Sequence, residues 1–103
     1  MEKQEVYLTE TENKQLQIIN HYGLENQLNQ LIEESSELVQ AICKWKRNYK
    51  SEGCIDGLDN LIEELADVLN LIEQIKLSDA YLTEGINKIK DYKIDRELKR
   101  ISS

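Results

Sequence analysis

Apolar residues recur every three or four positions along most of the chain, which is the spacing of helices with one buried face. The first such stretch follows the segment 9–12, Thr-Glu-Thr-Glu, which has capping-box spacing, and it stops at Gly23. A second helix is predicted from about Glu25 to near Arg47. We expect its buried face to consist of Leu28, Leu31, Ile32, Leu38, Val39 and Ile42.

Two more helices are predicted in the second half of the chain. Residues 48–57 contain two of the four glycines among polar residues and are predicted as a loop, with Asp56 as a candidate cap. A third helix follows from Leu58 to about Leu77, and Ser78-Asp79 can cap a fourth. The third helix should bury Leu58, Leu61, Ile62, Leu65, Val68, Leu69 and Ile72. The pattern predicts an all-α, four-helix bundle-like protomer that forms one domain over residues 1–103.

The second and third predicted helices are copies of one pattern. Residues 28–42 align with residues 58–72 at an offset of 30, and six of the fifteen positions are identical. The acids repeat in register, because Glu33, Glu34 and Glu37 align with Glu63, Glu64 and Asp67.

The repeated acids form a stripe beside the apolar face of each helix. Residues three apart are neighbours on a helix surface, so Glu34 and Glu37 can present two carboxylates to one point, as can Glu64 and Asp67. Two such helices side by side would bring four carboxylates together, and these repel one another unless cations neutralise them. Oxygen ligands of this kind suit Mg²⁺ first and Mn²⁺ next. The alternative is a solvated acidic face with no ligand.

Charge and composition exclude several other classes of protein. Twenty acidic and thirteen basic residues give a net charge of −7, which argues against nucleic-acid binding. Residues 88–103 are the exception, with six bases and three acids. We expect no membrane span and no signal peptide, and Cys43 and Cys54 match no disulfide or zinc pattern, so a cytoplasmic protein is expected. The single histidine, His21, lacks the preceding glutamate of a di-iron motif and is expected at the surface.

The two acidic motifs resemble those of the all-α nucleoside triphosphate pyrophosphohydrolases of the MazG and dimeric dUTPase type. The EExxE motif of that family corresponds to residues 33–37, and its ExxD motif to residues 64–67, with 26 residues between them. The similarity covers roughly residues 24–101, and residues 92–101 look like the end of the short, often phage-borne members.

The resemblance implies Mg²⁺-dependent hydrolysis of a nucleoside triphosphate, expected to be a dNTP, to the monophosphate and pyrophosphate. It also implies that Glu34, Glu37, Glu64 and Asp67 are the metal ligands. Glu33 is a candidate for orienting or deprotonating the attacking water, or for a structural role, because it points about 100° away from Glu34. Members of the family assemble as dimers or dimers of dimers, so a homodimer or homotetramer is expected.

Further residues are candidates for contacts with the nucleotide. Lys44 continues the stripe of Glu37, while Lys93 and Arg96 lie three apart in the basic segment; each could instead be solvated. Trp45 could stack on a base or pack, and Asn70 could contact the sugar or a water, or hold an interface. Two other functions remain open: a non-catalytic helical module that binds a nucleotide or protein, and an oligomeric bundle whose acids only confer solubility.

Overall fold

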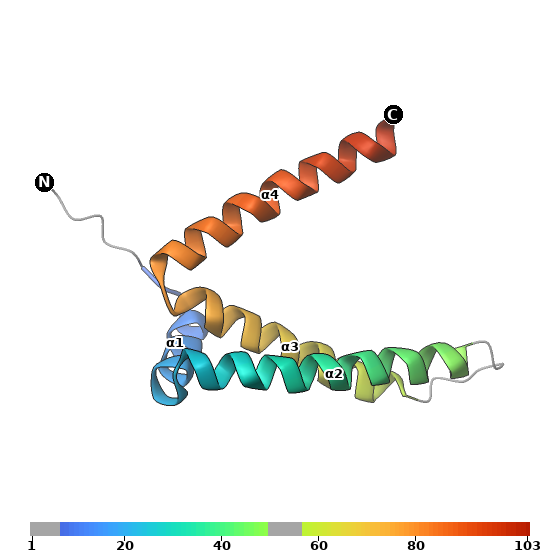
Figure 1. The fold of residues 1–103 in the computed structure, drawn as a ribbon, viewed down its shortest axis with the longest axis horizontal. Helices are drawn as coiled ribbons and strands as arrows, with labels where there is room; N and C mark the ends of the chain where they lie inside the picture. Colours follow the sequence, from blue (N-terminus) through green and yellow to red (C-terminus); the bar gives the residue numbers. More distant parts are fainter. Residues whose placement is uncertain (1–6, 50–56) are drawn as a thin grey trace, which may run out of the picture.

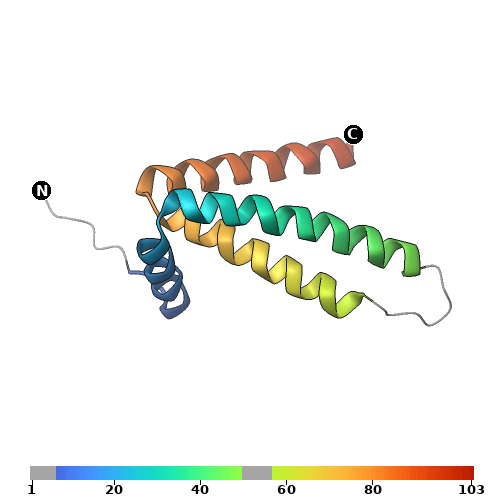
Figure 2. The ribbon, with the colours of Figure 1, turned by 60° about the horizontal axis from the view of Figure 1, so that its bottom comes forward.

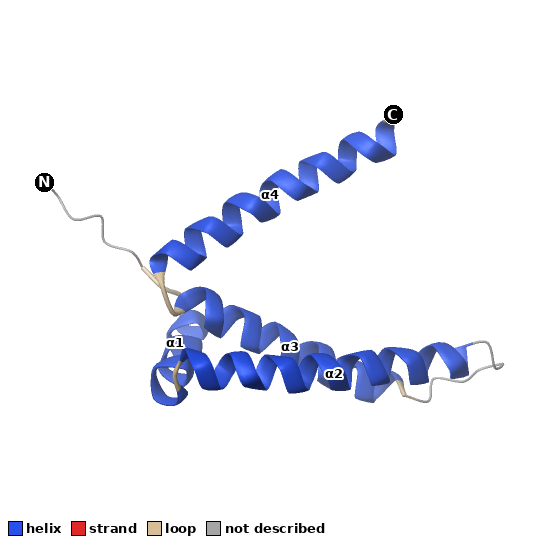
Figure 3. Cartoon of the chain, in the orientation of Figure 1, coloured by secondary structure: helices blue, strands red, loops and turns tan. Residues whose placement is uncertain are grey.

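The computed structural model describes residues 7–49 and 57–103, and every regular element in those ranges is a helix (Figures 1 and 3). The all-α prediction is therefore confirmed. The described helices are α1 (Glu10–Tyr22), α2 (Leu24–Tyr49), α3 (Leu58–Leu77) and α4 (Ala80–Ser102). None of them, in the part of the chain that the structure describes, combines the length and hydropathy needed to cross a membrane.

Short-range hydrogen bonds fix most of the helix ends where the sequence predicts them. At the start of α1 the backbone N–H of Glu12 donates to Thr9 Oγ1, and the N–H of Thr9 donates to Glu12 Oε1, both over 3.0 Å. Gly23 ends that helix with a φ of 89°, a value that glycine adopts readily. Asp79 caps α4 by accepting the backbone N–H of Tyr81 over 2.9 Å.

The predicted loop at residues 48–57 begins later than expected, whereas its end agrees with the prediction, because α3 starts at Leu58. Helix α2 continues through Tyr49, because neither Asn48 nor Tyr49 is a strong helix breaker. Gly57, with a φ of 88° and no side-chain cap bond, stands at the N-cap of α3. Asp56, the predicted cap, and Cys54 lie outside the described residues.

Helices α2 and α3 form an antiparallel hairpin, and α1 crosses one end of it and contacts both (Figure 2). The two repeats pack through equivalent positions. Ala41 and its equivalent Leu71 are both buried, and Glu34 and its equivalent Glu64 meet in the middle of the seam. Antiparallel helices that pack in this way are related by a local twofold axis perpendicular to both. Equivalent positions of α2 and α3 therefore lie on the same face of the hairpin.

The core of a single chain is small. Among the described residues only four apolar side chains are buried, namely Ile19, Ala41, Leu61 and Leu71. Among the described helices, α4 packs on α3 alone and then diverges from the hairpin (Figure 1). The radius of gyration is 17.6 Å, whereas a compact chain of this length would have about 13 Å. The single chain is thus an open arrangement of helices.

The prediction of a fully buried apolar face on α2 and α3 is wrong for a single chain. Ile32 is 69% exposed and Leu69 is 63% exposed. The seam between two helices covers one stripe of each, whereas the apolar pattern spans two adjacent stripes. The second stripe leaves one face of the hairpin uncovered, which we call the apolar face; its large exposed side chains are Leu28, Ile32, Val39, Ile42, Ile62, Leu65, Leu69 and Ile72.

Candidate metal centre

Three carboxylates converge at the middle of the hairpin. Glu34 and Glu37 come from adjacent turns of α2, and Glu64 comes from α3. One carboxylate oxygen from each of the three lies within 4.8 Å of the others. Asp67 lies one turn beyond Glu64 and outside this group of three. The pairing of residues three apart on a helix, together with the antiparallel seam, produces this convergence.

Among the described residues, no base forms an ion pair with the three carboxylates of this centre. Glu34 and Glu64 are half-buried, and within the described part of the chain the Oε2 atom of each is buried without a hydrogen-bond partner. Burial raises the pKa of Glu34 to about 7, and the carboxyl groups of Glu64 and Glu37 act in the same direction. The negative charge of Asp67 adds to this effect. A bare cluster of this kind is electrostatically unfavourable when all its members are ionised.

This donor set fits a divalent cation. Carboxylate oxygens are hard ligands of the type that Mg²⁺ and Mn²⁺ bind. The buried Oε2 atoms of Glu34 and Glu64 make no hydrogen bond that the binding of a cation would break. The ion pairs found among the described residues lie elsewhere, between Lys14 and Glu10 and between Arg100 and Glu97. A divalent cation would therefore supply positive charge that these ion pairs do not bring to the carboxylates.

A hollow of about 340 Å³ adjoins the carboxylates at one end. It is lined by Glu37, Gln40, Ala41, Lys44, Asn60 and Glu64, and we call it the Lys44 hollow. Lys44 lines this hollow together with Glu37, two helical turns before it on α2. Of the bases predicted to contact the nucleotide, Lys44 is the one that lies beside the carboxylates in the described part of a single chain.

A second hollow, of about 450 Å³, lies toward α1 on the same side of the hairpin. It is lined by Tyr22, Asn26, Gln27, Asn29, Gln30 and Leu71, and we call it the Gln27 hollow. The local twofold relates its Gln30 and Leu71 to Asn60 and Ala41 of the Lys44 hollow. The two hollows therefore lie on either side of the carboxylates along the hairpin.

Buried amides connect α1 to the hairpin next to the Gln27 hollow. Gln27 Nε2 donates to Gln74 Oε1 over 2.6 Å, and Gln74 Nε2 donates to Gln15 Oε1 over 2.8 Å. Gln15 Nε2 then donates to Asn70 Oδ1 over 2.9 Å, so Asn70 takes part in the interface between α1 and α3. Sequence reasoning missed the three buried glutamines. Helical periodicity could have indicated the burial of two of them, because Gln15 and Gln27 each stand four residues before an apolar position of the same helix.

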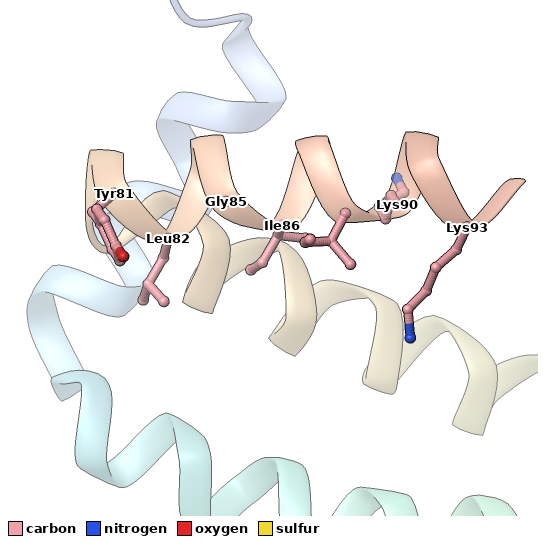
Figure 4. A pocket seen from close by; sticks show the side chains of 7 residues that line it. Tyr81, Leu82, Gly85, Ile86, Lys90 and Lys93 are labelled. Carbon is pink, nitrogen blue, oxygen red and sulfur yellow. The ribbon is translucent and has the colours of Figure 1, made fainter. Parts of the chain in front are cut away.

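Other predicted site residues lie apart from the carboxylates in one chain. Glu33 is exposed on α2, outside the group of three, and Trp45 is half-buried near Gly57. Lys93 points from α4 into a largely apolar hollow of about 460 Å³ (Figure 4). The guanidinium carbon of Arg96 lies 6.0 Å from the ring centre of Tyr92 on the same helix.

Comparison with known families agrees with this geometry. The chain matches the MazG nucleotide pyrophosphohydrolase domain over residues 23–97, which contain α2, α3 and all the carboxylates of the centre. Searches of curated proteins and of solved structures found no match. Because the matched segment covers well over half of the sequence, the resemblance predicted from the acidic motifs is confirmed. The chain belongs to the MazG nucleotide pyrophosphohydrolase family.

Proposed function

We propose that this protein hydrolyses a nucleoside triphosphate, with a dNTP as the favoured substrate, to the monophosphate and pyrophosphate in a Mg²⁺-dependent reaction. The observation that carries the proposal is the convergence of Glu34, Glu37 and Glu64 within 4.8 Å in a MazG chain. The buried, unpartnered oxygens of Glu34 and Glu64 support the binding of a cation there. Mn²⁺ is expected to substitute for Mg²⁺.

We assign the four carboxylates Glu34, Glu37, Glu64 and Asp67 to holding the cation. The chemistry supplied by Mg²⁺ when bound is neutralisation of the phosphates and an increase in the acidity of water. Lys44 adds a positive charge beside Glu37, where it can bind phosphate oxygens. Water attacks the α-phosphorus, the bond between that phosphorus and the bridging oxygen breaks, and pyrophosphate leaves. The proton of the water passes to a carboxylate, for which Glu33 is the exposed candidate.

Product analysis tests the reaction. The purified protein is incubated with each NTP and dNTP in the presence of Mg²⁺ or EDTA, and the nucleotide and phosphate products are separated. We expect monophosphate and pyrophosphate only with the metal. Glu34→Gln and Asp67→Asn should abolish turnover, whereas Glu63→Gln, at an exposed acid of α3, should retain it. Nucleotide binding without any product would instead support the alternative, a non-catalytic nucleotide-binding module.

We further propose that the protein is a homo-oligomer. The apolar face carries eight large exposed side chains, and an uncovered patch of this kind marks an interface. A second copy is the occupant that we propose, because a symmetric dimer pairs the same patch on both subunits and two apolar faces can cover each other. In one chain α4 holds Lys93 and Arg96 away from the carboxylates, so any contact between these bases and the substrate would need a second copy.

The oligomer can be tested by sedimentation at several protein concentrations. Ile32→Glu and Leu69→Glu should each dissociate the wild-type dimer or tetramer, because each places a charge in the apolar face. Gln17→Glu adds the same charge at an exposed position of α1 and should leave the mass unchanged. A monomeric wild-type protein would contradict the proposal.

A further inference from the structure

The two hollows on either side of the carboxylates differ in chemistry. The Lys44 hollow is lined by charged groups, the ammonium of Lys44 and the carboxylates of Glu37 and Glu64, whereas the Gln27 hollow has neutral amides and the ring of Tyr22. The difference arises because α1 covers only one end of the hairpin, where it supplies Tyr22 and ties Gln15 to Gln74. A nucleoside triphosphate has the same asymmetry, since its charged phosphates and its neutral base lie on opposite sides of the sugar.

We propose that the Gln27 hollow binds the nucleobase of the substrate, so that the triphosphate crosses the carboxylates toward Lys44. This inference rests on the proposed function, and it adds a binding site and an orientation for the substrate. The hollow lies beside the carboxylates because Gln30 and Asn26 precede Glu34 on one stripe of α2 by about one and two helical turns. A base subsite has to lie beside the reacting phosphates in this way, at the distance set by the sugar.

The side-chain amide of a buried residue in this hollow is already oriented. Gln27 is only 6% exposed, and its Nε2 is committed to Gln74, which fixes the plane of the amide. No described residue donates a hydrogen bond to Gln27 Oε1, which leaves this oxygen for a ligand in the hollow. An acceptor held by the fold recognises an N–H on the edge of a base, and a wrong base that covers this oxygen without donating to it would leave the oxygen unpaired.

The rest of the hollow suits the same ligand. Tyr22, at the C-terminal end of α1, is 55% exposed and offers a ring on which a base can stack. Gln30 and Asn29 carry exposed amides with both donors and acceptors, which can match the mixed edge of a base. Leu71 provides an apolar wall from α3.

Calorimetry with and without a base tests the inference. The probes are the α,β-imido analogues of dTTP, dCTP, dATP and dGTP, which resist cleavage, and inorganic tripolyphosphate, all with Mg²⁺. Tyr22→Ala should weaken binding of the nucleotide analogues by about 5- to 100-fold and leave tripolyphosphate binding unchanged. Gln27→Leu should change the ranking of the four bases. Lys44→Ala should weaken nucleotides and tripolyphosphate alike, and Gln17→Ala, an exposed amide of α1, should affect neither.

Each outcome of this experiment decides the question. Equal affinity of the wild type for nucleotides and tripolyphosphate would overturn the inference, because the base would then make no contact. Unchanged affinity and base ranking in both Tyr22→Ala and Gln27→Leu would also overturn it. Tyr22 is exposed, so its variant remains informative if Gln27→Leu fails to fold. Nucleotide binding that depends on Tyr22 but yields no turnover would uphold the base site and refute the proposed hydrolysis.

Discussion

The substitution Gln74→Leu tests whether the buried amides hold α1 on the hairpin. Gln74 is 5% exposed and makes two hydrogen bonds, one to Gln15 over 2.8 Å and one from Gln27 over 2.6 Å. Leucine has a similar volume but leaves the Gln27 donor and the Gln15 acceptor without partners. Each such orphaned group costs about 1–3 kcal/mol, so we expect the free energy of unfolding to fall by about 2–6 kcal/mol.

Thermal unfolding measures this loss. For a domain of this size 1 kcal/mol corresponds to about 4–8 °C, so Tm should fall by at least about 8 °C. The protomer concentration must be held constant, because oligomer formation shifts the apparent stability. The control is Gln17→Leu, at an exposed position of the same α1, which should change stability by less than about 0.5 kcal/mol.

A second substitution separates hydrogen bonding from packing. Adding Gln15→Leu to Gln74→Leu removes the orphaned acceptor, so the double variant should lose less stability than the sum of the two single variants. If Gln74→Leu proves as stable as Gln17→Leu, the amide chain does not stabilise the fold and the reasoning is refuted.

Four further predictions concern the centre and the helix ends. Folding raises the pKa of Glu34 from 4.5 to about 7, so the metal-free folded protein binds a proton at Glu34 more tightly than the unfolded chain does. The contribution of this proton to the free energy of unfolding should be full below pH 4.5 and lost as the pH rises to about 7. Glu34→Gln should flatten that decline in thermal melts with EDTA, and a decline of equal size in the variant would contradict the assignment. Glu33→Gln should lower kcat with little change in Mg²⁺ affinity in steady-state kinetics, and an unchanged kcat would refute a role for Glu33 in proton transfer. Gly57→Ala should destabilise the protein by about 1–2 kcal/mol in denaturant unfolding, because φ is 88° there and alanine avoids that region. Thr9→Ala should cost about 1 kcal/mol through loss of the cap on α1, and an unchanged midpoint would argue against it.

The helices and the pairing of acids follow from local physics, and the sequence predicted them well. The capping box at Thr9, the glycine at position 23 and the cap at Asp79 act within four residues, so the ends of α1 and the start of α4 agree with expectation. The spacing of Glu34 and Glu37 likewise depends only on the turn of one helix. The 30-residue repeat was sufficient to predict that α2 and α3 would bring equivalent carboxylates together.

The tertiary structure decided which of the two adjacent apolar stripes on α2 and α3 is buried between the helices. The sequence could not separate Leu61, which is buried in the seam, from Ile62, which is exposed, because both belong to the same broad apolar pattern. It also placed Lys93 among the candidate ligands of the nucleotide, whereas the direction of α4 carries this residue away from the carboxylates in one chain. The buried amide of Gln27 has its partner 47 positions away. Helix periodicity is local, whereas burial and charge partners depend on how helices cross, which involves residues far apart in the chain.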